Sequence, residues 1–257
     1  MSYVTLWSQM PIQLSNFPRR LLNRRGFACT CVLCGAAAPA RGLCDGCWAE
    51  LPWLHGPRCE RCAHPLPSPG LCGRCIAEPP HYDAVVAACR YAYPTGELIQ
   101  ACKYGGRLAA ATPLAAMLET VLDNRRPDIL VPMPLSAGRL RTRGFNQALE
   151  LARVLARALG TAADAGLCVK TRETPPQSRL PWKERRNNVR GAFTVHANLE
   201  GCHVAVVDDV LTTGATLSEL ARNLKRAGAA SVTGYVVART VAGGNAGRDS
   251  ALQGSAE

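Results

Sequence analysis

Residues 204–216, VAVVDDVLTTGAT, decide the fold of this 257-residue chain. The stretch opens with four apolar residues that lack helical periodicity, as in a buried parallel strand. Asp208 and Asp209 follow at the carboxyl end of this strand, and a Thr/Gly turn leads into a helix pattern. Thr216 and Glu219 have the spacing of a capping box, so we expect the helix to begin there. The stretch therefore predicts a strand, a loop and a helix of an α/β sheet.

The turn after the two acids has the chemistry of an anion site. The backbone N–H groups of residues 212–216 lie at a helix N-terminus, which favours a phosphate. Gly214 permits the positive φ or the close approach that such a loop needs, and three threonine hydroxyls add donors. Asp208 and Asp209 would repel a bare phosphate, so we expect them to face sugar hydroxyls or a bound Mg²⁺ on the same ligand. A ribose 5-phosphate combines both requirements.

This turn differs from the commoner nucleotide-binding motifs. No Gly-Lys-Thr/Ser follows, so it is not a Walker loop, and the dinucleotide pattern GxGxxG is absent. The alternative is an ordinary strand–loop–helix unit with surface acids, but such a unit rarely gathers two acids, three threonines and a glycine in nine residues. The stretch resembles the phosphoribosyl-pyrophosphate (PRPP) loop of type I phosphoribosyltransferases, an apolar strand followed by Asp-Asp and a Thr-Thr-Gly-x-Thr turn.

The composition is that of a folded, basic protein. The chain is 47% hydrophobic, which excludes a disordered polymer, and no apolar run approaches the ~20 residues of a membrane span. Residues 1–28 lack the apolar core of a signal peptide, so we expect a basic arm on a cytoplasmic protein without membrane contact. The formal net charge is +11, which eight thiolates with two Zn²⁺ would lower by four. The remaining positive charge favours phosphate or nucleic-acid partners.

Eight of the thirteen cysteines form two copies of one motif. Both copies read C-x2-C-x9-C-x2-C, and each cysteine of the second copy lies 28 residues after its counterpart, which indicates an internal duplication. A C-x2-C pair directs two sulfurs at one tetrahedral ion, and two such pairs complete a closed structural zinc site. The expected zinc ligands are Cys31, Cys34, Cys44, Cys47, Cys59, Cys62, Cys72 and Cys75.

The spacing leaves the pairing within the two zinc sites open. Local pairing within each repeat is the first choice, while alternating pairing would join Cys31 and Cys34 to Cys59 and Cys62. The knuckle spacing and the missing signal peptide argue against disulfides. Cys29 lies next to the first knuckle and could compete as a ligand. A closed site of four thiolates is structural, so we assign this module no chemistry.

From residue 83 onward, strand-like segments alternate with helix patterns. Strands are expected at 83–93, 128–135, 165–170, 191–195, 204–207 and 231–239, and helices at 97–104, 108–122, 145–159 and 216–227. This alternation predicts a parallel α/β sheet with the phosphate loop at the carboxyl ends of its strands. The expected organisation is a basic arm (1–28), a double zinc-binding module (29–80), a phosphoribosyltransferase-like domain (81–240) and a disordered tail (241–257).

Two basic segments lie between these elements. Arg139, Arg141 and Arg143 precede the helix pattern at 145–159, where the helix dipole disfavours cations, so either a bound anion or a solvated loop explains them. Residues 171–190 are Pro-rich, polar and basic, and a loop of this length is usually functional or disordered. With Trp182 among its cations, this loop could stack the bases of single-stranded DNA, or it could be a lid that touches only PRPP.

Longer motifs extend the resemblance to nearly the whole chain. After the cysteine module come KYGGR (103–107), VPMPL (131–135), RGFNQ (143–147), the pattern Q-x-x-L-x5-R-x-N-V-x-GAF (177–193) and VDDVLTTGAT (207–216). In this order they resemble the ComF (GntX-like) family. The resemblance implies a zinc-ribbon N-terminus and a type I phosphoribosyltransferase domain. It also implies a role in natural transformation, binding of single-stranded DNA and association with a DNA-uptake helicase.

The resemblance assigns site residues as well. Asp208 and Asp209 would meet the ribose hydroxyls, partly through Mg²⁺, and the turn would hold the 5-phosphate. The PRPP and Mg²⁺ set comprises Asp208, Asp209, Thr212, Thr213, Gly214, Ala215 and Thr216. The pyrophosphate and flexible-loop set comprises Ser136, Arg139, Arg143 and Arg185.

Three functions are open on the sequence alone. The first is a PRPP-binding protein of DNA uptake, the second an active phosphoribosyltransferase acting on a base or an amine, and the third a nucleic-acid adaptor with a vestigial site. The intact 208–216 motif argues against the third. Phosphoribosyltransferases need a further part, the hood, that recognises the nucleophile. Nothing in this sequence identifies a hood, although the zinc module is a candidate for that position. No residue stands out as a general base, so we assign no catalytic residue.

Overall fold

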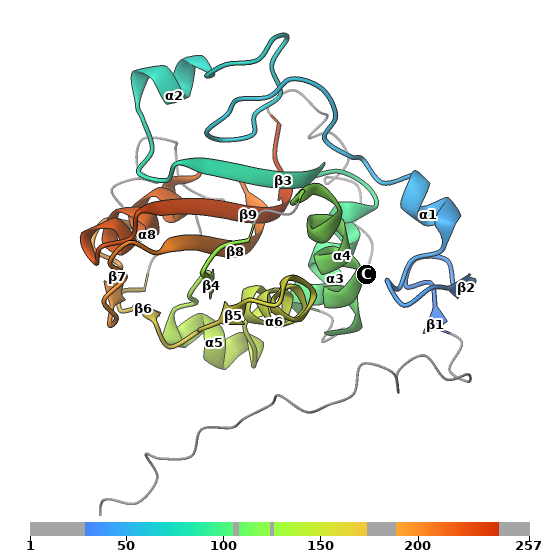
Figure 1. Ribbon diagram of the computed structural model, residues 1–257. Helices are drawn as coiled ribbons and strands as arrows, with labels where there is room; N and C mark the ends of the chain where they lie inside the picture. The colour runs from blue at the N-terminus through green and yellow to red at the C-terminus, as the bar shows by residue number, and fades with distance from the viewer. Residues whose placement is uncertain (1–28, 105–107, 124–125, 174–188, 242–257) are drawn as a thin grey trace, which may run out of the picture.

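The computed structural model describes residues 29–104, 108–123, 126–173 and 189–241 (Figure 1). The expected arm and nearly all of the expected tail lie outside these ranges. At the centre is a five-stranded parallel sheet, which confirms the predicted fold class. Its strand order is β3 (Ala84–Arg90), β9 (Ser231–Arg239), β8 (His203–Leu211), β4 (Ile129–Pro132) and β5 (Ala162–Ala163).

Helices cover both faces of this sheet (Figure 1). One face packs on α8 (Ala215–Arg226). The other packs on α4 (Ala111–Val121) and α6 (Gln147–Leu159), and their hydrophobic cluster also takes in α3 (Thr95–Tyr104). The short helix η1 (Leu108–Ala110) precedes α4, so Pro113 falls in the first turn of α4, where proline is tolerated.

Strand β8 is covered on both faces, which explains its continuous run of apolar residues. Val204 and Val206 belong to the hydrophobic cluster of α8, whereas Ala205 and Val207 belong to the cluster of α4 and α6. Successive side chains of a strand point to opposite faces, so a strand covered on both faces is apolar at every position. All four side chains are at most 1% exposed. The run therefore holds the two acids that follow it at the edge of the sheet.

Two segments after β4 differ from the expectation. The arginines at 139–143 lie on a helix, α5 (Ala137–Arg143), rather than in a loop, because Ser136 takes the N-cap position and Gly144, at φ 79°, ends the helix. The strand expected at 165–170 is β6 (Cys168–Lys170), which pairs antiparallel with β7 (Phe193–Val195) outside the main sheet. Strand β5 has only two residues, too short for a sequence pattern.

The start of α8 also differs. Gly214, at φ 78°, takes the N-cap position, and the helix begins at Ala215 without a side-chain cap. The capping box expected from Thr216 and Glu219 was wrong, because the Glu219 carboxylate accepts hydrogen bonds from the Gly191 N–H and from Arg222. The carboxylate therefore bonds to a group distant in sequence and not to the start of its own helix. A glycine at the junction lets the loop turn sharply into the helix.

The cysteine-rich part forms two small ribbons that pack at different places (Figure 1). The first ribbon contains β1 (Cys29–Thr30), β2 (Ala37–Ala38) and α1 (Asp45–Ala49), and it contributes buried leucines to the cluster of α3 and α4. The second ribbon contains α2 (Gly73–Ala77) and contributes its four cysteines to the cluster of α8. Both ribbons therefore share hydrophobic contacts with the sheet domain.

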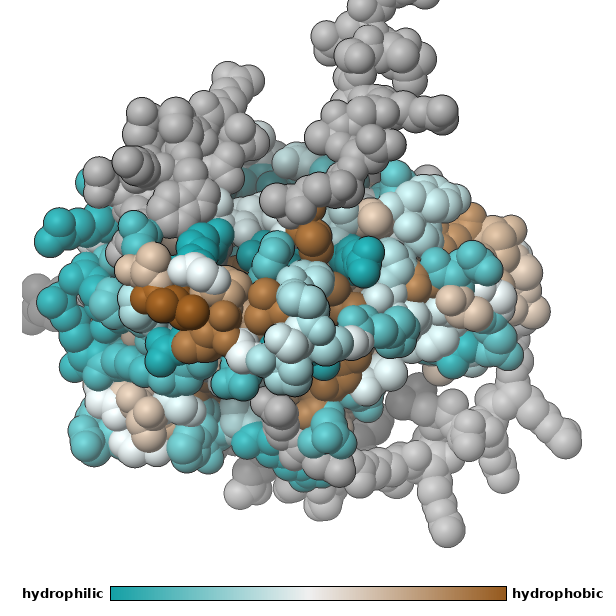
Figure 2. Space-filling model, turned by 90° about the horizontal axis from the view of Figure 1, so that it is seen from above, coloured by the Kyte–Doolittle hydropathy of each residue, from teal (hydrophilic) through white to brown (hydrophobic). Residues whose placement is uncertain are grey.

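Figure 2 views the molecule from the side of the second ribbon. Hydrophobic residues occur there in small areas among hydrophilic ones. All four cysteines of that ribbon are buried in the hydrophobic cluster that also contains residues of α8. Within the described ranges, the helices are too short or too polar to cross a membrane.

Candidate functional site

A cleft of about 1280 Å³ opens at the carboxyl ends of β4 and β8, where the sequence predicts the ligand site. Its walls come from α3, from the connection between β4 and α5, from β6, and from the loop between β8 and α8. Its described lining contains no residue of the two ribbons, so the structure gives no support to the zinc module as the hood. The end of α3 stands at the cleft instead.

Most of the residues predicted for the site meet in this cleft. Asp208 and Asp209 line it together with the loop residues Thr212, Gly214, Ala215 and Thr216, and so do Ser136, Arg139 and Arg143. Thr213 is not among the residues that line the cleft. Its hydroxyl accepts a hydrogen bond from the Ala215 N–H at 3.3 Å. Arg185 lies outside the described residues. Segments 70 residues apart in the sequence thus form one surface.

The backbone of the loop is oriented by bonds to its carbonyl groups. Arg239 donates to the carbonyl oxygens of Leu211, at 3.1 Å, and of Thr212, at 2.6 Å. Arg74 donates to the carbonyl of Thr213. Among the described residues, no acceptor meets the N–H groups of Thr213 and Gly214. These are free amides of the kind that bind phosphate at a helix N-terminus.

The two acids are compensated by a lysine that the sequence reasoning missed. Lys103, near the end of α3, forms an ion pair with Asp209, whose residue surface is only 5% exposed. Asp208 accepts a hydrogen bond from the Asp209 N–H at 2.9 Å. Burial, followed by the neighbouring Asp209, raises the pKa of the Asp208 carboxyl well above its ordinary value. Burial alone would lower the pKa of Lys103, but the Asp209 carboxylate outweighs it and the pKa is raised.

Another part of the cleft wall is basic. Ser136 is buried at the start of α5, and Arg139 and Arg143 follow on that helix. Lys170 also lines the cleft, and burial, with Arg139 next, lowers its pKa to about 8. The Arg143 guanidinium lies 5.2 Å from the centre of the Tyr104 ring. Basic side chains and an acidic pair in one cleft suit a ligand that carries both phosphate groups and hydroxyls.

Sequence reasoning missed four residues around the cleft. Lys103 and Tyr104 line the cleft and belong to the KYGGR motif, whose pattern alone indicates no role. Lys170 ends a strand whose pairing the sequence does not reveal. Arg239 ends β9, and its apolar strand context offers no signal for a buried cation. Only the three-dimensional arrangement brings these side chains to the loop.

The eight predicted zinc ligands form two clusters, each within one repeat, as local pairing predicts. In each cluster the four sulfur atoms lie within 4.8 Å of one another. The Sγ atoms of Cys34 and Cys44 are 3.7 Å apart, as are those of Cys62 and Cys72. Four sulfurs at ~2.3 Å from a tetrahedral ion would be separated by about 3.8 Å, so both clusters fit Zn²⁺.

One thiol in each cluster is readily ionised, whereas the pKa of another thiol in the same cluster, Cys47 or Cys75, is raised. Burial would raise the pKa of Cys31, but backbone N–H donors outweigh it and lower the pKa to about 6. The same balance lowers the pKa of Cys59 to about 7. Thiolates are the metal-binding form, so both sites contain a sulfur that is readily ionised. Cys29 is exposed in β1 and lies outside both clusters.

Comparisons with family models agree with this architecture. Residues 24–76 match the double zinc ribbon domain, and residues 109–254 match the phosphoribosyl transferase domain. The fold and the two cysteine clusters therefore define a double-zinc-ribbon protein with a type I phosphoribosyltransferase fold.

Comparison with individual relatives identifies the family. The chain is 37% identical over 219 residues to the DNA utilization protein YhgH of Escherichia coli O157:H7, covering 82% of this chain and 90% of that protein. It is 30% identical to Competence protein F of Haemophilus influenzae, covering 77% and 90%. Competence protein ComFC of Bacillus subtilis is 37% identical over 44% of this chain and 45% of its own length. The chain belongs to the ComF (GntX-like) family of competence proteins.

Two solved structures are distant likenesses. A purine phosphoribosyltransferase from Pyrococcus horikoshii shares 22% identity, covers 53% of this chain and 85% of its own, and gives a TM-score of 0.31. The allosteric regulatory enzyme of purine biosynthesis shares 21% identity, covers 53% and 29%, and gives a TM-score of 0.36.

Proposed function

We propose that this protein binds PRPP with Mg²⁺ in the cleft and acts in DNA uptake during natural transformation. The observation that carries the proposal is the loop between β8 and α8. Its carbonyl groups are bonded at residues 211–213, while the amides of Thr213 and Gly214 have no acceptor among the described residues. An acidic pair, with Asp209 buried and Asp208 half-buried, stands directly before it. This combination suits a ribose 5-phosphate better than a bare phosphate.

Each part of the ligand has a partner in this arrangement. The 5-phosphate would take the loop amides and the Thr212 hydroxyl. The ribose hydroxyls would face Asp208 and Asp209, whose oxygens are also ligands that Mg²⁺ prefers. The pyrophosphate would lie toward Ser136 at the start of α5 and the basic wall. Bound Mg²⁺ would supply positive charge to the pyrophosphate oxygens.

The biological role rests on relatives and on charge. The names of the relatives refer to competence and to DNA utilization. Residues 171–190 are basic and contain Trp182, a composition suited to stacking and phosphate contact with single-stranded DNA. Bonds between β6 and β7, with Arg172 donating to the Arg190 carbonyl, hold the two described ends of this segment together. We place the protein in the cytoplasm, with a DNA-uptake helicase as its partner.

Binding of PRPP is expected to require both acids. Asp208→Asn with Asp209→Asn should weaken Mg²⁺–PRPP binding by more than about 100-fold, because two charge-assisted contacts to the ligand are lost. Isothermal titration calorimetry with Mg²⁺ and PRPP measures this. Asp123→Asn, an exposed acid away from the cleft lining, is the matched control. A wild-type protein that binds no PRPP would remove the proposed function.

An active phosphoribosyltransferase is the second candidate, and Tyr104 favours it. This side chain is 73% exposed, lines the cleft and lies beside Arg143, so it offers a face for a planar base. Transfer would break the bond between ribose C1 and pyrophosphate while a base or amine nitrogen attacks C1, with the basic wall stabilising the leaving group. Pyrophosphate release with a panel of bases and amines tests this, and release with none of them leaves a binding role.

Binding of single-stranded DNA is expected to depend on the basic segment and on salt. With about three phosphate contacts, affinity should fall on the order of ten-fold between 50 and 200 mM salt. Arg185→Ala with Arg186→Ala should weaken binding further in fluorescence anisotropy. Arg153→Ala with Arg157→Ala on α6 removes the same charge elsewhere and serves as the control. Salt-insensitive binding, or equal effects of the two pairs, would exclude this segment as the contact.

A further inference from the structure

A buried arginine joins the second zinc ribbon to the phosphate loop. Arg239, at the end of β9, is 4% exposed. Its guanidinium group donates to the carbonyl of Cys62, at 3.0 Å, as well as to the carbonyls of Leu211 and Thr212. Cys62 is a ligand of the second zinc cluster. One planar, permanently charged side chain thus fixes a zinc knuckle and the loop relative to each other.

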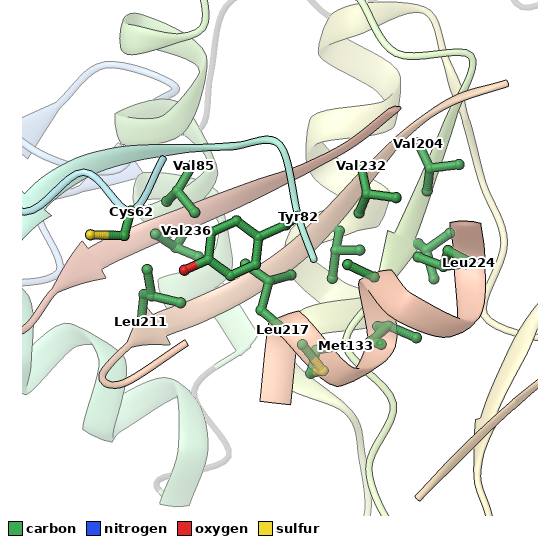
Figure 3. Packing of buried hydrophobic residues seen from close by; sticks show 14 of the residues in the cluster. Cys62, Tyr82, Val85, Met133, Val204, Leu211, Leu217, Leu224, Val232 and Val236 are labelled. Atoms are coloured by element: carbon green, nitrogen blue, oxygen red, sulfur yellow. The ribbon is translucent and has the colours of Figure 1, made fainter. Parts of the chain in front are cut away.

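Further contacts tie the same ribbon, and the two residues that follow the zinc module, to the loop and to α8. Arg74 lies between two zinc ligands on α2 and donates to the Thr213 carbonyl. The His81 N–H donates to the Ser218 hydroxyl on α8 at 3.0 Å. Tyr82, 1% exposed, lies behind Gly214, where an added Cβ would stand 2.7 Å from its hydroxyl. Figure 3 shows the Tyr82 ring among Val85, Val236 and Leu217.

These bonds determine which way the loop amides point. A trans peptide is planar, so each carbonyl oxygen and the N–H of the next residue point in opposite directions. Arg239 holds the Thr212 carbonyl, and Arg74 holds the Thr213 carbonyl. The N–H of Thr213 therefore points away from Arg239, and the N–H of Gly214 points away from Arg74. Gly214 lines the cleft.

We propose that Arg74 and Arg239 are positioning residues that let the second zinc ribbon hold the phosphate loop in its anion-binding conformation. The inference rests on the proposed function and adds a role for the ribbon in it. The described part of the first ribbon has no arginine at the equivalent position, because the repeat places Gly46 where the second ribbon has Arg74. An arginine of the first ribbon, Arg41, instead donates to Leu43 and lies over Trp48 within the ribbon.

Arg74→Gln tests the proposal, because Arg74 is only half-buried and its removal spares the core. We expect affinity for Mg²⁺–PRPP in calorimetry to fall by about ten-fold, as for the loss of one charged hydrogen bond. In the protein without PRPP, amide hydrogen exchange of the 210–217 peptide should become faster. Arg74→Lys keeps a cationic donor and should restore most of both. Arg58→Gln removes the same charge from the same ribbon, where its partner is the Leu54 carbonyl, and should change neither.

The two readouts separate this inference from the proposed function. If wild type binds PRPP and Arg74→Gln binds it with unchanged affinity, the positioning role is wrong. If wild type binds no PRPP, the proposed function fails, and hydrogen exchange alone decides whether the ribbon holds the loop. Equal exchange in Arg74→Gln, Arg58→Gln and wild type would then overturn the inference.

Discussion

The double substitution Cys62→Ser, Cys75→Ser is expected to unfold most of the chain, whereas Cys34→Ser with Cys47→Ser should leave the sheet folded. The four sulfurs of the second cluster are all buried, and they belong to the hydrophobic cluster that joins β8 and α8. In the first cluster only Cys31 is buried. Structural zinc contributes about 10–16 kcal/mol in zinc-finger peptides, comparable with the ~5–15 kcal/mol of a whole domain.

Circular dichroism and metal analysis check this difference. We expect two zinc ions per wild-type chain and one per chain in the Cys34→Ser, Cys47→Ser variant, with near-native ellipticity. The Cys62→Ser, Cys75→Ser variant should lose ellipticity as well as zinc. Equal loss of structure in both variants would contradict the asymmetry, and a wild-type value near one zinc would mean that one cluster is not a site.

The sequence was most informative where periodicity and burial agree. The run at 204–207 predicted a strand covered on both faces, and β8 is such a strand. The 28-residue repeat predicted two zinc sites, and local pairing follows because a ribbon of about 17 residues brings its two knuckles together without help. These features depend on neighbours in sequence or on the two-residue period of a strand.

Contacts between distant segments were not predictable in the same way. Lys103 reaches Asp209 across 106 positions, and Arg239 reaches Cys62 across 177. No spacing rule relates such residues. The capping-box prediction failed for a related reason, since Glu219 found the Gly191 N–H instead of its own helix end. The site residues were recognisable as a motif, but the groups that neutralise and orient them became visible only in the fold.

The Lys103–Asp209 ion pair explains how the fold tolerates two adjacent acids at this position. Two adjacent carboxylates at the end of a buried strand cost free energy unless a cation compensates them. Lys103 supplies that cation without any ligand. The fold can therefore keep both carboxylates in place without a ligand. We therefore expect the removal of Lys103 to lower the free energy of unfolding.

Lys103→Met is expected to destabilise the protein by about 3 kcal/mol at pH 8, as for the removal of one partner of a buried ion pair. Urea unfolding measures the change. Addition of Asp209→Asn should restore most of the loss, because no carboxylate is then left unpaired at that position. A double-mutant cycle with Asp209→Asn gives the coupling between the two side chains.

The same variant should respond to pH with a definite sign. The pKa of the Asp208 carboxyl is raised by burial and by Asp209, so the folded state binds a proton more readily than the unfolded state. Such a group adds stability as the pH falls through its folded pKa and loses that contribution as the pH rises through it. Without Lys103 this pKa rises further, so the deficit of Lys103→Met should shrink between pH 8 and pH 5. A deficit that stays constant over this range, or that Asp209→Asn fails to reduce, would show that Lys103 acts by packing and not by compensating the acids.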